Sequence, residues 1–573
     1  MKTSIFLASF TVMLTFLAFS PSEVYFRNPS EFDIEIWEFL GTAIGLSFAF
    51  SIVLFVVLAA AARVCPAGFA SRITAVLTSF GLAAFLQGSY LGWGFGPLDG
   101  SPIDWSRPMG LKIMGASIWL VPLIMPQVLE FLRAQNLIRT VCMALLAIQT
   151  MLLGVHIVSF DHYRSYKDYS ADRTDLMQFS SGKNAIVLVL DEFQCDIFQE
   201  VLARVPALAD ALAGFTYFPD AVASSSQTFP SVPALLTGQF YDNSQTSGEY
   251  ITEAYNQNSL PAQLRQAGIR SELYPVIPGT VLTSPLLADN AIARSYSTQA
   301  YTGTVYFGML RAFPVFLKRQ TIRWERWLDE RSSERKSLTP SQKYWSMELF
   351  RDSLPSAHVA NQPATFKFIH LEGTHIPIRL DENLNEINTE YSRESFIRQA
   401  TGVVRLLAVM VQRLAELGIY DNSVILVVGD HGSGRDPGMW LYPTDKTNKT
   451  FNRFKARGCP LFLAKPVGAA ADTLQFSSAP VSLTDVPPTI LGELGISPAQ
   501  SEPSLNGLPG DVPFSEARSV FSIEEGESRI RGYYGYAWAR FEPSYLPPIS
   551  EFIIDGNVRS DASWQAGRMF VAE

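Results

Sequence analysis

The chain is poor in cysteine and histidine, the residue types that most often bind zinc. Its 573 residues include four cysteines and six histidines. No two cysteines form a Cys-x-x-Cys pair, so a cysteine-based zinc module and a disulfide-dense scaffold are excluded, and a single pairing of Cys195 with Cys459 stays open. Charged residues are also sparse, at 17% of the chain, and the net charge is -9. Because there is no basic excess, no nucleic-acid partner is expected.

Long apolar runs, in contrast, fill the beginning of the chain and raise its mean hydropathy to +0.12. A helix needs about 20 apolar residues to span a bilayer. Five runs approach this length, at residues 4–20, 36–62, 73–93, 111–132 and 138–158. We therefore predict a five-helix transmembrane domain over residues 1–160, a juxtamembrane linker over 161–182 and an outer domain over 183–573.

The distribution of charge predicts that this outer domain lies outside the cytoplasm. The first loop between the runs is acidic, whereas every second loop is basic. The basic residues are Lys2, Arg63, Arg72, Arg133 and Arg139. Basic loops stay in the cytoplasm, so five spans place the rest of the chain on the other side. A cleaved signal peptide over the first run is an alternative, although Pro21 after the candidate cleavage point argues against it, and cleavage would not change the predicted side.

The second part of the chain alternates between two hydrophobic patterns. Residues 184–190 form an apolar, β-branched run that ends at Asp191, and residues 366–370 and 423–429 have the same form. Such runs are typical of buried parallel strands, whose functional residues follow the carboxyl ends. Residues 395–417 instead repeat apolar positions at spacings of three and four, as a helix does. Strands that alternate with helices predict a doubly wound α/β sheet.

Polar residues near these strand ends indicate a metal-activated nucleophile. Asp191 ends one strand, and the pair Asp430 and His431 ends another. Thr228 lies after the first strand–helix unit and adds a hydroxyl. Carboxylate, imidazole and hydroxyl together suit one divalent ion, Zn²⁺ or Mn²⁺ with Mg²⁺ also acceptable, which would lower the pKa of the Thr228 hydroxyl for attack. His375, just past a third strand, offers an imidazole that could donate to a phosphoryl oxygen or protonate a leaving group.

Residues 184 to about 500 resemble the sulfatase and alkaline-phosphatase superfamily. The run Thr228–Gly238 matches the sulfatase pattern C-x-P-S-R-x-x-L-L-T-G, except that Thr replaces the Cys and Val232 replaces the Arg. Residues 424–432 match the metal-binding strand end of the superfamily, and residues 481–491 resemble its late structural helix. The resemblance implies an alkaline-phosphatase-like domain.

The two departures from the pattern weigh against a sulfatase. Sulfatases of this type oxidise the Cys or Ser to formylglycine, and the Arg belongs to that site, but here Thr228 and Val232 stand instead. Threonine is what the phosphotransferase branch of the superfamily uses. The segment Leu190–Gln194 is similar to the strand end of lipoteichoic acid synthases. This similarity implies that Asp191 is a metal ligand and that Glu192 lies beside it as a supporting residue.

Apolar spans followed by such a domain resemble lipoteichoic acid synthases, periplasmic-glucan phosphoglycerol transferases and lipid A phosphoethanolamine transferases. The resemblance implies a multi-pass protein of a bacterial inner membrane with a periplasmic or extracellular catalytic domain. It also implies transfer of a head group from phosphatidylglycerol or phosphatidylethanolamine to Thr228, and then to a hydroxyl of a glycan or lipid acceptor. The scarcity of cysteine favours phosphoglycerol. The alternative is a membrane-anchored phosphodiesterase, phosphatase or sulfatase-like hydrolase, although a two-metal phosphatase would need histidines beyond His431.

Several further residues could have either a functional or a structural role. Relatives place one cation near the phosphoryl group, and the candidates here are Lys449, Lys455 and Arg457. We list Lys455 and Arg457 as substrate-binding residues, and a place in a solvated loop is the alternative for each. His370 lies inside its predicted strand, and we interpret it as a hydrogen-bonded core residue. Residues 307–328 mix aromatic with basic side chains, which predicts an interfacial helix on the outer leaflet. A core helix with a basic outer face is the alternative.

Overall fold

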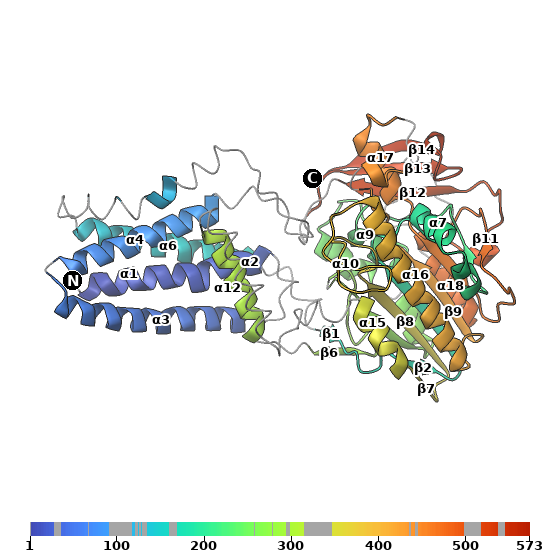
Figure 1. The fold of residues 1–573 in the computed structure, drawn as a ribbon, viewed down its shortest axis with the longest axis horizontal. Coiled ribbons are helices and arrows are strands. Elements are labelled where there is room, and N and C mark those ends of the chain that lie inside the picture. The colour runs from blue at the N-terminus through green and yellow to red at the C-terminus, as the bar shows by residue number, and fades with distance from the viewer. Residues whose placement is uncertain are drawn as a thin grey trace. The chain divides into compact units, whose positions relative to one another are not determined.

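The computed structural model describes most of the chain and separates it into two compact units (Figure 1). The residues outside the description are 1, 28–35, 67, 91–116, 121–123, 125–127, 129–134, 160–168, 257, 278, 294–297, 314–346, 435–436, 442–444, 498–516, 537–544 and 573. Unit 1 comprises residues 1–162 and 295–339, and unit 2 comprises residues 163–294 and 340–573.

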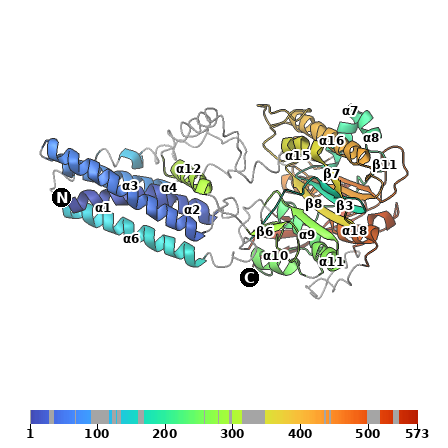
Figure 2. The ribbon, with the colours of Figure 1, turned by 90° about the horizontal axis from the view of Figure 1, so that it is seen from below.

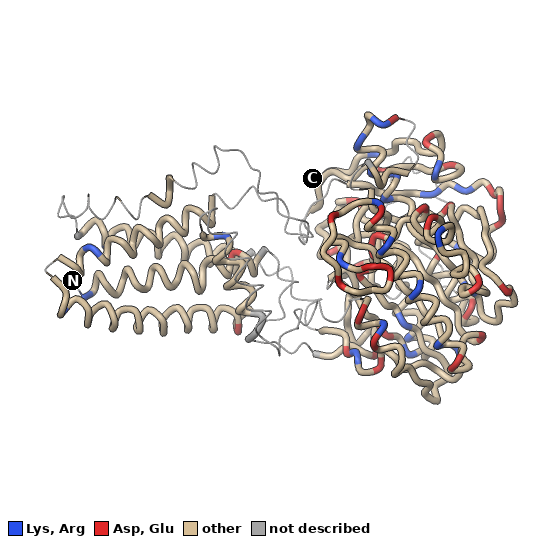
Figure 3. The backbone as a smooth tube through the Cα atoms, viewed as in Figure 1, with Lys and Arg blue, Asp and Glu red and all other residues tan. Residues whose placement is uncertain are grey.

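Unit 1 is a bundle of apolar helices. Its elements are α1 (Lys2–Leu14), the π-helical turn η1 (Thr15–Phe19), α2 (Ser20–Arg27), α3 (Ile36–Val64), α4 (Phe69–Tyr90), α6 (Gln135–Ser159) and α12 (Thr298–Ala312). Lys, Arg, Asp and Glu are rare along this bundle and frequent over unit 2 (Figure 3). In the described part of the chain, four helical stretches are long and apolar enough to cross a membrane, at residues 2–26, 36–64, 69–90 and 136–158. These stretches support membrane anchoring. The fifth predicted span, at 111–132, falls almost entirely outside the described residues.

The helix α12 departs from the predicted domain division. Its segment interrupts unit 2 in sequence, yet α12 packs against α2, α3 and α4 of the bundle. The predicted interfacial helix over residues 307–328 therefore differs from the structure in its bounds, because α12 starts at Thr298 and ends at Ala312. The remainder of that prediction lies mostly outside the described residues.

Unit 2 contains the predicted α/β sheet. Seven strands lie in the order β11-β4-β10-β9-β3-β8-β5. Their bounds are β3 (Lys183–Leu190), β4 (Thr216–Tyr217), β5 (Arg270–Tyr274), β8 (Ala364–Leu371), β9 (Ser423–Val428), β10 (Phe462–Lys465) and β11 (Gln475–Phe476). The three long apolar runs of the sequence are β3, β8 and β9, and these strands are parallel neighbours at the centre of the sheet. The α/β fold class is thus confirmed.

Helices cover both faces of this sheet, as Figure 2 shows. The helices are α7 (Cys195–Arg204), α8 (Ala207–Ala211), α9 (Thr228–Thr237), α10 (Ser247–Ala254), α11 (Leu260–Gln266), α15 (Met347–Ser353), α16 (Arg393–Glu416), α17 (Lys449–Arg457) and α18 (Val486–Leu494). Because successive strand residues point to opposite faces, Val187 and Val189 of β3 enter the core under α9 and α18. Ile186 and Leu188 enter the core under α7 and α16. Burial on both faces explains why the strand has an unbroken apolar sequence.

Smaller sheets complete unit 2. Strands β12 (Ile530–Tyr536), β13 (Ile549–Asp555) and β14 (Trp564–Phe570) form an antiparallel sheet near the end of the chain. Two short pairs join β1 (Tyr169–Ala171) to β6 (Ala291–Ala293), and β2 (Gln178–Ser180) to β7 (His358–Ala360). The structure thus differs from the linker predicted over 161–182, because β1 and β2 pair with later strands of unit 2.

Candidate metal and nucleophile site

The carboxyl ends of three neighbouring strands bring the candidate site together. Asp191 directly follows β3, and Asp430 follows β9 after one glycine. His370 lies within β8, opposite Val189 of β3, and both strands are parallel to β9. Parallel neighbours end at the same edge of a sheet, so residues far apart in the sequence meet there.

A group of three donors could hold a metal ion at this edge. One ligand atom each from Asp191, His370 and Asp430 lies within 4.8 Å of the others, and all three residues are buried. His370 is completely buried, and neither of its ring nitrogens has a hydrogen-bond partner among the described residues. Burial and the nearby His375 lower the pKa of His370 to about 3, which leaves the imidazole neutral and able to donate a lone pair. The donor types and their geometry fit a divalent ion.

His370 corrects the sequence interpretation, which placed it as a hydrogen-bonded core residue. A buried polar group without a partner is costly, and a metal ion would remove this cost. Its Nε2 lies 3.8 Å from Oδ2 of Asp191. The missed signal is its place one residue before the end of an apolar strand, because that position opens onto the functional edge of a parallel sheet.

Thr228 and His431 also lie close to Asp430. The Thr228 hydroxyl is 3.4 Å from Nε2 of His431, which is 3.4 Å from Oδ2 of Asp430. Nδ1 of His431 lies 2.9 Å from the carbonyl of Gly432, so this nitrogen carries the proton and Nε2 presents its lone pair to the site. Burial keeps the pKa of His431 well below its usual value, which keeps the ring neutral. Burial raises the pKa of Asp430 to about 6, although hydrogen bonds from Glu192, Thr228 and His431 act to lower it.

The Thr228 segment is fixed to the strand end by its own sequence. Thr228 is 8% exposed and begins α9 at a kink, since Phe229 and Pro230 have non-helical backbone angles. The hydroxyl of Ser231 donates to the carbonyl of Asp430 at 2.6 Å, which ties the two motifs together. Val232 is fully buried in the apolar core. The position that holds Arg in the sulfatase pattern therefore faces hydrophobic side chains in this chain.

Arg457 supplies a guanidinium to the site. It is 1% exposed, and its Nη1 lies 3.2 Å from Oε1 of Glu192. Its Nη2 donates to Oε1 of Gln227 at 3.0 Å and lies 3.3 Å from Nε2 of His431. Glu192 has a left-handed backbone (φ 61°), and its amide donates to Oδ1 of Asp430 at 3.0 Å. Arg457 thus links the strand end at Glu192 to the residues that precede Thr228.

The structure places the remaining predicted residues in different surroundings. His375 is partly buried and close enough to lower the pKa of both His370 and His431 by charge. Lys455 does not join this group: its ammonium pairs with Asp561 at 2.5 Å. Residues two apart on a helix point in different directions, so α17 cannot present both Lys455 and Arg457 to one site. The Lys455 ammonium is thus engaged by Asp561, and its substrate-binding role stays a prediction.

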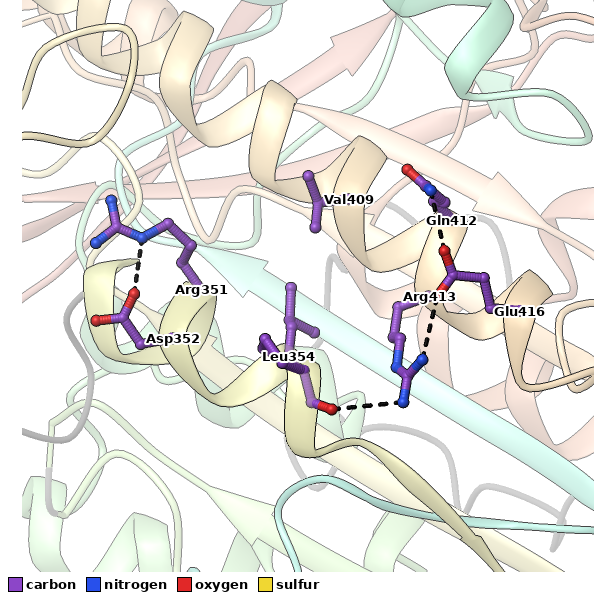
Figure 4. A pocket seen from close by; sticks show the side chains of 8 residues that line it. Arg351, Asp352, Leu354, Val409, Gln412, Arg413 and Glu416 are labelled. Atoms are coloured by element: carbon purple, nitrogen blue, oxygen red, sulfur yellow. Dashed lines mark hydrogen bonds and ion pairs between the residues drawn. The ribbon is translucent and has the colours of Figure 1, made fainter.

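A surface pocket of about 760 Å³ lies elsewhere on unit 2, between α15 and the end of α16 (Figure 4). Its arginines are engaged: Arg351 donates to Asp352, and Arg413 donates to Glu416 and to the carbonyl of Ala357. The end of α16 leads into the amino end of β9, whereas Asp430 follows the carboxyl end. The pocket thus lies away from the candidate site.

The chain is similar to several solved structures, at low sequence identity and low TM-score. The periplasmic domain of EcEptC from Escherichia coli is 14% identical with a TM-score of 0.33, over 58% of this chain and 85% of that one. The lipoteichoic acid synthase LtaP from Listeria monocytogenes is 14% identical with a TM-score of 0.35, over 71% of this chain and 92% of that one. The phosphonate monoester hydrolase SpPMH from Silicibacter pomeroyi is 16% identical with a TM-score of 0.35, over 67% of this chain and 88% of that one.

No curated protein matches the chain at a significant level. The sequence model of the sulfatase family, however, matches residues 183–496. This match covers more than half of the chain, including both strand ends and the Thr228 segment. The chain belongs to the sulfatase family.

Proposed function

We propose that this protein is a membrane phosphotransferase that moves a phospholipid head group, with phosphoglycerol favoured, to a hydroxyl of a glycan or lipid. The observation that carries the proposal is the nucleophile position. It holds a threonine, which cannot become formylglycine, and the Thr228 hydroxyl lies 3.4 Å from His431 beside three buried carboxyl groups. The N-terminal apolar helices favour a donor that resides in a membrane.

Asp191 and Asp430 would hold one divalent ion together with Thr228, and the imidazoles of His431 and His370 offer two further donors. When bound, this ion supplies positive charge that stabilises the phosphoryl oxygens and lowers the pKa of the Thr228 hydroxyl. The protein residues perform the remaining tasks of positioning and proton transfer.

Transfer would occur in two displacements. In the first, Oγ1 of Thr228 forms a bond to phosphorus, and the bond between phosphorus and the diacylglycerol oxygen breaks. Thr228 gives its proton to solvent, and the diacylglycerol oxygen takes a proton from His375. In the next displacement, an acceptor hydroxyl forms a bond to phosphorus and gives its proton to His375. The bond between phosphorus and Oγ1 of Thr228 breaks, and Thr228 regains a proton from solvent. Arg457 orients the Thr228 segment through Gln227 during both steps.

The test is a mass measurement on the intact protein after incubation with Mn²⁺ and mixed phospholipids. We expect a phosphoglycerol adduct on Thr228 in the native chain and none in Thr228→Ala. An adduct with the mass of phosphoethanolamine would change the donor but keep the reaction type. Water-soluble glycerol phosphate that forms without an adduct, and without any modified acceptor, would favour the hydrolase alternative. Absence of turnover with every phospholipid in the presence of metal would refute the proposal.

A further inference from the structure

The helix α12 belongs to unit 1, although the residues before and after its segment belong to unit 2. Its segment, residues 295–339, leaves unit 2 between β6 and α15 and belongs to the helical bundle. The chain therefore passes between the units at three places: after residue 162, after 294 and after 339. A single linker after α6 would be enough to connect two domains, so the two further passages require a separate explanation.

A polar cluster around one buried carboxylate connects α12 to the bundle. Glu23 of α2 is 7% exposed, and its Oε1 lies 2.6 Å from Nε2 of His156 on α6. Its Oε2 lies 3.6 Å from Arg311 on α12. Arg311 also donates to the carbonyl of Gly88 on α4 at 2.9 Å. One carboxylate thus joins three helices, and its neighbour Arg311 reaches a fourth.

The packing beneath this cluster is as close as two helices allow. A Cβ on Gly308 of α12 would lie 2.8 Å from the backbone nitrogen of Pro21. A Cβ on Gly88 would lie 3.7 Å from Cα of Ala312. Thr304 is completely buried, and the hydroxyl of Tyr301 donates to the carbonyl of Leu17. Small residues at such crossings are how helices associate in apolar surroundings, where the hydrophobic effect offers little.

Ordinary core packing does not need both a charged cluster and close contacts at glycine residues. A carboxylate in an apolar bundle is costly unless it is paired, and here the Arg311 partner comes from a segment that belongs in sequence to unit 2. Seating of α12 therefore adds a second charged partner to a carboxylate that His156 already contacts within the bundle. The cluster lies near the ends of α2, α4 and α6, and α6 is the helix from which the chain continues into unit 2.

We propose that α12 is a clamp, which fastens the inserted segment to the bundle and thereby tethers unit 2 to the membrane unit at a second place along the chain. The proposal rests on the proposed function for the identity of the donor. It assigns to Glu23, His156 and Arg311 a positioning role, since none of them belongs to the candidate site. Release of the clamp should impair turnover of a lipid donor and spare turnover of a soluble phosphodiester.

The packing of α12 on the bundle can be tested without any assumption about activity. Thr304→Cys places a near-isosteric thiol in the buried face of α12, and Thr302→Cys places one on its exposed face. In the purified full-length protein in detergent, a polar maleimide should label Thr302→Cys rapidly and Thr304→Cys slowly, with the native cysteines as the baseline. Addition of Gly308→Leu, whose side chain cannot fit against Pro21, should make labelling of Thr304→Cys about as fast as that of Thr302→Cys. If both thiols were labelled equally fast in the absence of Gly308→Leu, the proposal that α12 is a clamp would be overturned.

The functional part uses Gly308→Leu and a matched control, Gly154→Leu on α6, because Gly154 has no atom within 4 Å of a built Cβ. Arg311→Gln is a milder variant in case Gly308→Leu does not fold. In mixed micelles, Gly308→Leu and Arg311→Gln should lower release of the lipid head group by about tenfold or more, because unit 2 is then tethered to the bundle by the linker after α6 alone. Cleavage of bis(p-nitrophenyl) phosphate should stay within about twofold.

The outcomes separate the two proposals. Equal losses with the lipid and with the soluble substrate, or no loss with either, would refute a positioning role for α12. If the native protein cleaves neither substrate, the proposed function fails, while the labelling experiment still decides whether α12 is seated.

Discussion

The turn that carries His375 passes unusually close to Asp191, and this approach can be tested with one methyl group. Gly373 has a left-handed backbone (φ 55°), and a Cβ there would lie 2.6 Å from the nitrogen of Asp191 and 2.8 Å from its carbonyl oxygen. The amide of Thr374 donates to that same carbonyl at 2.9 Å. All the obstructing atoms are backbone, so no side chain can rotate away. Gly373→Ala should therefore displace the Asp191 strand end.

The free-energy cost of Gly373→Ala has two parts, and substitution of other glycines measures one of them alone. Gly418 is also left-handed (φ 70°) but has nothing within 4 Å of a built Cβ, so Gly418→Ala measures the backbone cost alone, about 1 kcal/mol. At Gly373 the Cβ falls about 0.8 Å inside ordinary contact, and overlap of this kind costs about 1–3 kcal/mol. We expect Gly373→Ala to lower the free energy of unfolding by about 2–4 kcal/mol.

The assay compares Gly373→Ala with Gly418→Ala and with Gly492→Ala, a glycine without positive φ or close neighbours. Urea unfolding of the full chain in detergent gives the stability differences, and calorimetric titration with Mn²⁺ gives the metal affinity. Affinity should fall by about tenfold or more in Gly373→Ala, since Asp191 is a proposed ligand, and stay unchanged in the controls. If Gly373→Ala matched Gly418→Ala in stability and in metal affinity, the close approach would have no role in placing Asp191.

Four further predictions concern the site and its surroundings. Thr228→Ser should keep transfer within about tenfold of the native rate while Thr228→Ala loses it, as measured by head-group release; equal activity of the two variants would exclude a hydroxyl nucleophile. His370→Phe should lower the metal content of the purified protein by about tenfold or more, and His370→Asn by less, as measured by elemental mass spectrometry; unchanged content would return His370 to a core role. Because burial raises the folded pKa of Asp430 to about 6, metal-free protein should lose stability as pH rises from about 4 to 6, and Mn²⁺ affinity should fall about tenfold per pH unit below 6. Calorimetry at several pH values checks this, and an affinity that is flat between pH 4 and 6 would contradict it. Lys455→Met should lower stability through loss of the Asp561 ion pair but leave the specific activity of folded protein unchanged; a selective loss of activity would place Lys455 in the site.

The strands of the site were predictable because burial on both faces imposes a continuous apolar sequence. The predicted runs at 366–370 and 423–429 agree with β8 and β9 within two residues at each end, and the helix over 395–417 agrees with α16. Asp191 and Asp430 follow from this pattern, since each is the first charged residue after such a run.

His370 was not predictable in the same way, because its role depends on strand register. One imidazole inside an apolar strand has the same sequence signature as a buried core histidine. Its place beside Asp191 follows from the pairing of Val189 with His370, a contact across about 180 residues of sequence. Local pattern contains no information on that pairing, and so the missing ligand candidate emerges only from the fold.

The same limit applies to α12. Aromatic and basic residues over 307–328 indicate affinity for an interface, and the sequence gives no sign that the preceding residues would seat on the apolar helices. The partner of Arg311 is Glu23, a residue from the first loop region by sequence. In the sequence Glu23 is one of several acidic residues after the first apolar run, and an ion pair between distant helices has no local signature.

Charge balance gives the strongest physical argument for a divalent ion. Asp191, Glu192 and Asp430 bring three carboxyl groups into a site where each is at most 3% exposed. Among the described residues that contact them, Arg457 contributes one positive charge, and the surrounding imidazoles are neutral because burial lowers the pKa of His370 and His431. Val232 faces the apolar core, so the sulfatase arginine position adds no charge. Burial of three carboxyl groups beside one guanidinium is costly, and binding of a proton or a cation would lower this cost. Burial raises the pKa of Asp430 in the metal-free site, and a divalent ion would offset the negative charge there without protonating a ligand.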